Sequence, residues 1–451
     1  MNATILLLAL ASQTPTATPP PPEGVLTLDA ALTRAWNEAP AVSTAEANAQ
    51  VARARIDIAA ANGFPSLAAD VAASGGAGNS NGLFGACSIE TATGCSKGAG
   101  VVAGVTAGLG AQWLLFDFGR TSENVRSARL SANASDADVD SARYQAAVTA
   151  GASFLAVAGD EQLMQSRSKI VEERQRLLDV AHGRVQTGVA APIEETRAKV
   201  ALETAKVDVL TTDAARKNDL ASLAIALGMD PNKQIAIAQP GPLAVNDDPV
   251  QAADLAEQAR PELAALKLRV DAAEATLSSA RAGRLPSLTA TANANAGPSI
   301  TAYGAPAGTL AEQATLGATF SIPIFDAGIS AAVAAAEAED LVAKAGLRQA
   351  TLDLRAQAAQ AATAVRSNAA ALSAAEQLLS EADEDFRQAS GRYELGAASL
   401  LELTDAENEQ SSATLSVVQA RFQLEAARLR LLAAIGTIGR SAPTGSTTPA
   451  R

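Results

Sequence analysis

Carboxylates stand at matching positions after two glycines that are far apart in the chain. Glu194 lies six residues after Gly188. Glu402 lies six residues after Gly396, and Asp405 follows three residues later. Carboxylates that gather at one place would favour cations and repel anions. A glutamate in the first turn of a helix is also favoured by the helix dipole alone, so both interpretations stay open.

Few other residues could do chemistry. Cys87 and Cys95 are the only cysteines, and in an exported protein we expect them to form a disulfide that closes a small loop. His182 is the only histidine, and we interpret it as an ordinary surface residue rather than a pH sensor. The sequence contains no nucleophile–base set, phosphate loop or metal cluster, so we expect no enzyme, no metal site and no cofactor.

Each of the two glycines separates a pair of long helical patterns. Apolar residues recur at helical spacing, without proline, over about 121–186 and 330–393. Second patterns follow over 193–227 and 400–434. The pattern over 400–434 has a coiled-coil seam, and the pattern over 193–227 has a seven-residue repeat. The members are Leu415, Val418, Phe422, Ala426, Leu429 and Leu432, and Ile193, Val200, Val207 and Ala214. Because glycine readily ends a helix in the left-handed conformation, the sequence predicts two long coiled-coil hairpins.

Four shorter segments alternate apolar with small polar side chains. They cover about 65–76, 100–116, 286–297 and 313–325. Period two over about ten residues, with an almost uncharged polar face, is typical of membrane β-strands. The alternative is that these segments are strands of a soluble sandwich, but such strands would expose charged side chains. Because four strands leave unpaired edges in lipid, the pattern predicts a barrel closed from several chains.

The two halves of the chain carry the same landmarks in the same order. Pro40 and the Pro-Ser-Leu at 65–67 return at Pro261 and 286–288. The Phe-Asp-Phe-Gly that begins at Phe116 returns as a Phe-Asp-Ala-Gly that begins at Phe325. Proline ends a helix before each strand, and the aspartate can cap the helix that follows. We infer one module of about 210 residues that is present twice, at 25–240 and 241–436.

Composition narrows the class of protein. The chain has 451 residues, of which 48% are hydrophobic and only 3% aromatic, which suits closely packed helices. The net charge of −13 argues against a nucleic-acid partner. We interpret residues 1–24 as a signal peptide and disordered leader, and 437–451 as a disordered tail.

These landmarks together resemble the TolC-like outer-membrane efflux protein family, the outer membrane factors, over about 25–436. The resemblance is carried by Arg260-Pro261-Glu262-Leu263 at a helix start, by the two Pro-Ser-Leu motifs, and by Leu115-Phe116-Asp117-Phe118-Gly119-Arg120 and Pro323-Ile324-Phe325-Asp326-Ala327-Gly328. It implies a mainly α fold with membrane β-strands, assembled as a homotrimer with a 12-stranded barrel on an α-helical periplasmic tunnel.

The resemblance also implies a function and its partners. Such a protein is a conduit in the lipid of the outer membrane, serving a tripartite efflux pump or type I secretion. It docks with a periplasmic adaptor (membrane fusion) protein and an inner-membrane RND or ABC transporter. A periplasmic coiled-coil adaptor is the alternative, but it would have one hairpin and soluble β domains. A structural envelope protein without a pore is a further alternative.

Roles for the two glycine turns follow from the same resemblance. The periplasmic gate would comprise Glu194, Glu402, Asp405 and Tyr393. The adaptor would dock on the tips at Thr187, Gly188, Val189, Leu395, Gly396 and Ala397. The family pattern places an arginine two residues after the second glycine, where this chain has Ala398. This departure puts the hydrogen-bonded latch of the family in doubt here.

Overall fold

The computed structural model describes residues 25–79, 99–233, 235–301 and 309–438. Cys87 and Cys95 lie outside the described residues, so their disulfide stays a prediction, as does the signal peptide. The chain forms two compact units, and each draws on both halves of the sequence. The strand unit comprises Thr44–Ser141 and Arg260–Asp353. The hairpin unit comprises Met1–Ser43, Ala142–Ala259 and Leu354–Arg451.

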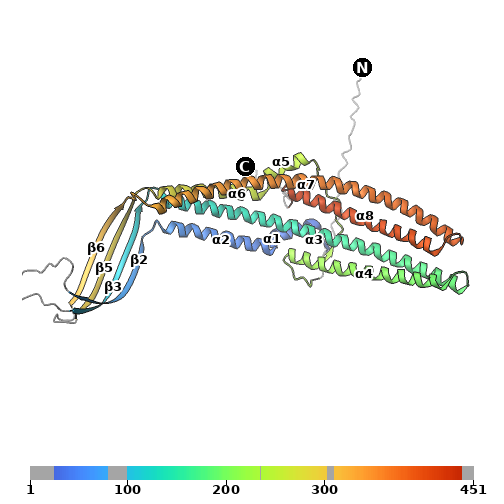
Figure 1. Cartoon of the computed structure of the whole chain (residues 1–451), viewed down its shortest axis with the longest axis horizontal. Coiled ribbons are helices and arrows are strands. Elements are labelled where there is room, and N and C mark those ends of the chain that lie inside the picture. Colours follow the sequence, from blue (N-terminus) through green and yellow to red (C-terminus); the bar gives the residue numbers. More distant parts are fainter. Residues whose placement is uncertain (1–24, 80–98, 234, 302–308, 439–451) are drawn as a thin grey trace, which may run out of the picture. The chain divides into compact units, whose positions relative to one another are not determined.

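The strand unit contains one antiparallel sheet of four strands, which Figure 1 shows side by side. They are β2 (Ser66–Asn79), β3 (Ala99–Phe116), β5 (Ser287–Thr301) and β6 (Thr309–Ser321). The spatial order is β2-β3-β5-β6, so β2 and β6 are its edges. The predicted strands are present, but β6 ends at Ser321 rather than at 325. Pro323 has no N–H to donate to a neighbouring strand, which explains the earlier end.

The two faces of this sheet differ in the way that the alternation predicts. One face exposes large apolar side chains, among them Leu67, Val71, Leu109, Leu316 and Phe320. The other is polar, and one row across it aligns Asp70, Gly108, Asn295 and Gln313. A Cβ atom at position 108 would lie 2.6 Å from Asn295 Oδ1 and 2.8 Å from Asp70 Oδ1. Glycine therefore leaves room for both side chains over β3.

Four helices begin where the duplicated motifs predict. α2 (Pro40–Ala61) and α6 (Pro261–Ala282) both start at a proline, which lacks the N–H that would be unpaired there. α3 (Arg120–Gln186) and α7 (Ala327–Glu394) follow the strands β3 and β6. Asp117 Oδ2 accepts from the Thr121 N–H at 2.7 Å. Asp326 Oδ1 accepts from the Gly328 N–H at 2.7 Å, so both predicted aspartate caps are confirmed.

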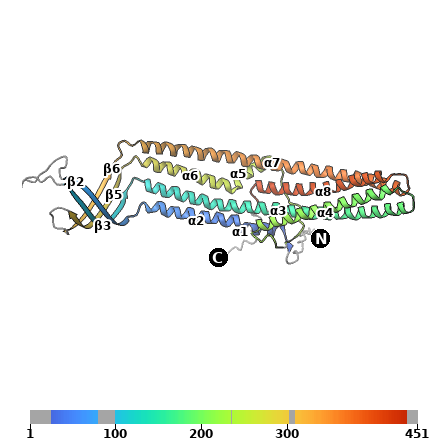
Figure 2. The ribbon, with the colours of Figure 1, turned by 60° about the horizontal axis from the view of Figure 1, so that its bottom comes forward.

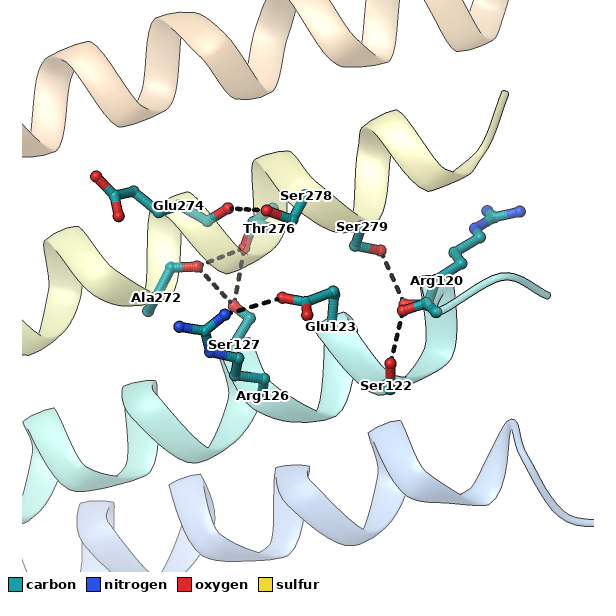
Figure 3. A network of polar contacts seen from close by, with 11 residues as sticks. Arg120, Ser122, Glu123, Arg126, Ser127, Ala272, Glu274, Thr276, Ser278 and Ser279 are labelled. Carbon is teal, nitrogen blue, oxygen red and sulfur yellow. Dashed lines mark hydrogen bonds and ion pairs between the residues drawn. The ribbon is translucent and has the colours of Figure 1, made fainter. Parts of the chain in front are cut away.

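Small polar side chains fasten the start of α3 to α6 (Figure 3). Ser127 Oγ donates to the carbonyl oxygen of Ala272 at 3.0 Å and lies 2.8 Å from Thr276 Oγ1. Near the end of α6, Ser279 Oγ donates to the Arg120 carbonyl oxygen at 3.1 Å. These bonds fix the start of α3 against a helix from the other half of the sequence.

Two long hairpins make up most of the hairpin unit (Figure 2). α3 turns into α4 (Pro192–Ala226), and α7 turns into α8 (Leu400–Ala434). The predicted seam on α8 is displaced: of its six residues only Leu429 is fully buried. The buried stripe has alternating spacings of four and three, and comprises Ala413, Val417, Ala420, Leu424, Ala427, Leu431 and Ala434. Alanine is a weak apolar signal in a sequence, although its small side chain permits close helix packing.

The other ends of these hairpins are also duplicated. α4 and α8 stop at Gly228 and Gly436, which have φ angles of +67° and +76°. A Cβ atom at Gly228 would lie 2.7 Å from the Glu38 carbonyl oxygen, at the end of α1 (Leu28–Glu38). At Gly436 it would lie 3.0 Å from the carbonyl oxygen of Ala259, which ends α5 (Pro249–Ala259). Each glycine thus lets one helix end pack on the backbone of another.

Smaller features complete the hairpin unit. β1 (Val25–Leu26) pairs in parallel with β4 (Ala236–Ile237). Ile438 is buried against Tyr144 and Leu429, so the folded part continues to this residue. Within the described ranges, no helix has a stretch both long and apolar enough to cross a membrane.

Candidate functional site

The turn between α3 and α4 and the turn between α7 and α8 have the same backbone. Gly188 has φ +74°, and its N–H donates to the Val185 carbonyl oxygen at 3.0 Å. The Val189 N–H donates to the Arg184 carbonyl oxygen at 2.9 Å. Together these bonds make the Schellman motif, which pairs the last carbonyl groups of a helix. Both bonds recur in the second turn, where Gly396 has φ +73°.

The six residues predicted for adaptor docking are all exposed at these turns. Two of them are apolar, with Leu395 86% exposed and Val189 69% exposed. In a Schellman motif the residue after the glycine commonly packs back on the helix, but Val189 stays in solvent. The tips therefore present apolar side chains outward.

Two of the predicted gate residues meet across the two hairpins. Tyr393, near the end of α7, is only 2% exposed. Its hydroxyl donates to Glu194 Oε2, in the first turn of α4, over a long 3.4 Å. Burial raises the pKa of Tyr393, Arg184 opposes this rise and Glu194 adds to it. The hydroxyl therefore stays protonated at neutral pH and can donate.

Arg184 is a third member of this contact, and the sequence reading did not single it out. Its Nη1 donates to the Tyr393 carbonyl oxygen at 3.0 Å. Its Cζ lies 4.3 Å from the centroid of the Tyr393 ring, which is a cation–π distance. A sequence signal existed, because an arginine stands four residues before each glycine, as Arg184 and Arg392.

Glu402 and Asp405 occupy different surroundings from Glu194. Glu402 forms an ion pair with Arg392 within its own hairpin, and its N–H donates to Ser399 Oγ at 3.2 Å. Asp405 is exposed and lines a groove of about 490 Å³ between α3, α4 and α8. Arg197 of α4 lines the same groove. The structure thus joins Glu194 to Tyr393, whereas Glu402 pairs with Arg392 and Asp405 shares a groove with Arg197.

The first hairpin is fastened near its tip by charged side chains. His182 is half exposed, as predicted for a surface residue, but its Nδ1 lies 3.1 Å from Glu195 Oε1. Lys199 Nζ lies 2.6 Å from the same oxygen. Hydrogen bonds from Lys199 and then His182 lower the pKa of Glu195.

An apolar cluster fastens the second hairpin and includes Leu177 of α3, and a buried ion pair lies directly beside this cluster on α8. The cluster comprises Leu177, Ala389, Tyr393, Leu400, Leu403 and Ala406. Arg174 Nη1 lies 2.8 Å from Glu407 Oε2, and both side chains are almost fully buried. Burial raises the pKa of Glu407, and Arg174 opposes this rise. Sequence periodicity did not reveal this pair, because it says nothing about partners across helices.

The side chains at the tips are suited to electrostatic and apolar contacts. Among the described residues, no group of three or more His, Cys, Asp or Glu side chains could hold a metal ion. What the tips provide is a set of carboxylates with basic and aromatic partners, next to exposed apolar residues.

The sequence of this chain is similar to those of known proteins. The family model described as outer membrane efflux protein matches residues 31–229 and 252–437. Protein CyaE of Bordetella pertussis is 27% identical over 339 residues, which is 73% of this chain and 70% of CyaE.

Solved structures share the fold at low identity. The outer-membrane channel OprN has a TM-score of 0.73 and 21% identity, over 91% of this chain and 90% of OprN. The CmeC outer membrane channel of Campylobacter jejuni has a TM-score of 0.73 and 17% identity, over 92% of this chain and 87% of CmeC. With the family model matching most of its length, the chain belongs to the outer membrane efflux protein family, and its place is the outer membrane with an extension into the periplasm.

Proposed function

We propose that three copies of this chain form an outer-membrane channel for a tripartite efflux pump or a type I secretion system. Family members are trimers that work with adaptors and inner-membrane transporters. For this chain the expected partners are a periplasmic adaptor protein and an RND or ABC transporter of the inner membrane. The observation that carries the proposal is the four-stranded sheet, which cannot be complete in a single chain.

The sheet has two unmet requirements. Its apolar face is exposed, with Leu316 87% and Val71 78% accessible. Its edges, β2 and β6, have no partner strand among the described residues. Lipid would cover the apolar face, but an open edge in lipid costs several kcal/mol for each unpaired backbone group. Pairing β6 of one copy with β2 of the next closes twelve strands, four from each copy.

A helix of the hairpin unit independently favours a second copy as neighbour. Ile193, Val200 and Val207 lie seven residues apart along α4, and each is more than half exposed. Leu210 adds to the same exposed apolar surface at 69%. A heptad stripe of this kind is the usual seam of a coiled coil. Packing against a helix of the next copy would bury it, which a monomeric adaptor or a poreless structural protein would not require.

The tips would serve as the periplasmic end. Exposed Val189 and Leu395 offer an adaptor apolar contact at turns that are repeated around the ring. Rings of Glu194, Glu402 and Asp405 would narrow the bore and favour cations. Because Arg392 pairs with Glu402, we assign the larger share of the cation preference to Glu194 and Asp405.

The oligomer is tested by native mass measurement of the detergent-purified protein. The proposal predicts a particle of three chains. A monomer that stays monomeric at high protein concentration would favour the adaptor or structural alternatives instead.

The gate assignment is tested by a pair of opposite substitutions in one groove. Asp405→Asn removes a negative charge and should lower the cation preference, measured as the reversal potential in a salt gradient. Arg197→Gln removes a positive charge from the same groove and should raise it. Unchanged reversal potentials in both variants would show that this groove does not face the ion path.

A further inference from the structure

We propose that Arg184 is the residue that latches the resting gate, in the absence of an arginine at position 398. This inference rests on the proposed channel function and adds a positioning residue to it. Arg184 lies at the end of α3, in the first half of the sequence, whereas its partner Tyr393 lies at the end of α7, in the second half.

The contact joins the two hairpins through two different interactions. The guanidinium donates to the Tyr393 carbonyl oxygen at 3.0 Å and stacks on the ring at 4.3 Å. A planar guanidinium can do both at once, which a lysine ammonium cannot reproduce. The same carbonyl oxygen accepts the Gly396 N–H at 3.0 Å in the Schellman motif. Arg184 therefore hydrogen-bonds to the backbone that forms the second tip.

The surroundings of the contact make it strong and yet breakable. Tyr393 is 2% exposed, and its bond to Arg184 is partly buried, which strengthens the bond relative to one in water. Arg184 Nε is buried, and it has no hydrogen-bond partner among the described residues. This closed arrangement leaves one donor unsatisfied, and moving α7 away from α3 would return that donor to water. The unsatisfied donor therefore lowers the free energy needed to separate α7 from α3.

Opening must break these contacts together. Tyr393 also donates to Glu194 of α4, so the two elements of the first hairpin hold one side chain of the second. Separation of the hairpins removes the hydrogen bond, the ring stacking and the Glu194 contact in one step. Arg392, the equivalent arginine of the second half, pairs with Glu402 inside its own hairpin and cannot take this role.

The test is single-channel recording of the purified protein with Arg184→Gln. Loss of a hydrogen bond to a charged group should shift the ratio of closed to open time about tenfold toward open. Arg184→Lys should give an intermediate shift, because the charge remains and the planar contact is lost. Arg387→Gln is the matched control, since Arg387 is an exposed arginine of α7 near the same tip, and its described contacts, with Asp383 and Glu384, lie within its own helix.

Tyr393→Phe separates the parts of the latch. It removes the hydroxyl contact to Glu194 but keeps the ring and the carbonyl, so Arg184→Gln should still open the channel in this background. Open times equal to wild type in both Arg184 variants would overturn the proposal. If Arg184→Gln does not fold, Arg184→Lys decides alone. A wild-type protein that forms no pores at all would instead contradict the proposed function.

Discussion

The two hairpin tips have one backbone and two different ways of being fastened. Each has an arginine four residues before its glycine and a glutamate six residues after it. Seven residues after the glycine, the first tip has Glu195 and the second has Leu403. Glu195 pairs with His182 and Lys199 in partial contact with water, whereas Leu403 is buried in an apolar cluster. Duplication therefore preserved the turn, and side-chain divergence decided what each turn can hold.

One further difference gives the second tip its partner in the first. Val185 of α3 corresponds to Tyr393 of α7, so only the second tip has a buried aromatic ring. Arg392 finds its glutamate, Glu402, in its own hairpin. Arg184 instead turns to Tyr393, whose hydroxyl is held by Glu194. The asymmetry between the halves thus creates one contact between the two tips.

The largest expected difference between the tips comes from their fastening side chains. Leu403→Ala should destabilise the second tip by about 2–5 kcal/mol, because it leaves a cavity in a buried cluster. Glu195→Ala, the equivalent change in the first tip, should have a much smaller effect, since exposed ion pairs contribute little. Native-state hydrogen exchange of the two turn regions measures both. Equal losses of protection would show that the tips are fastened alike.

The shared backbone predicts an equal effect at the two glycines. Gly188→Ala and Gly396→Ala should each cost about 1–2 kcal/mol in their own turn, because a left-handed conformation strains any residue with a Cβ atom. Neither Cβ atom would meet another residue within 4 Å, so strain is the whole cost. Gly183→Ala and Gly391→Ala are the controls, one turn earlier within each helix, and should stabilise it by up to about 1 kcal/mol.

A smaller, pH-dependent difference is expected at Glu195. Its pKa is lowered in the folded protein, so its contribution is present at neutral pH and is lost as the pH falls below the ordinary glutamate range and through the lowered pKa. Hydrogen exchange at the first tip should distinguish wild type from Glu195→Gln at pH 7 and cease to do so in strong acid. The second tip should show no such difference at either pH. A difference that persists in acid would contradict the ionic fastening.

Much of this fold could be predicted because its signals are local. Proline at 40 and 261, aspartate at 117 and 326, and glycine at 188 and 396 each act on the backbone within a few residues. The bounds of the four long helices therefore agree with the prediction to within a few residues. Gly228 and Gly436 carry the same signal at the other helix ends, and the same reasoning would have found them.

What could not be predicted depends on contacts between distant segments. The sequence pattern predicted that the bulkier apolar side chains of α8 form its buried seam, whereas the stripe that is buried is rich in alanine. Charge patterns gave no partner for Arg174, which pairs with Glu407 from the other half of the chain. The gate carboxylates were predicted as one set, but the structure gives Glu194 a tyrosine and Glu402 an arginine. Such pairings follow from packing, not from spacing.

We expect this protein to be a channel whose resting state is narrowed at the tips, and recording from the purified protein in a planar bilayer tests this. A trimeric channel should give discrete, cation-preferring current steps. Absence of conductance under every condition, together with a monomer in detergent, would contradict it.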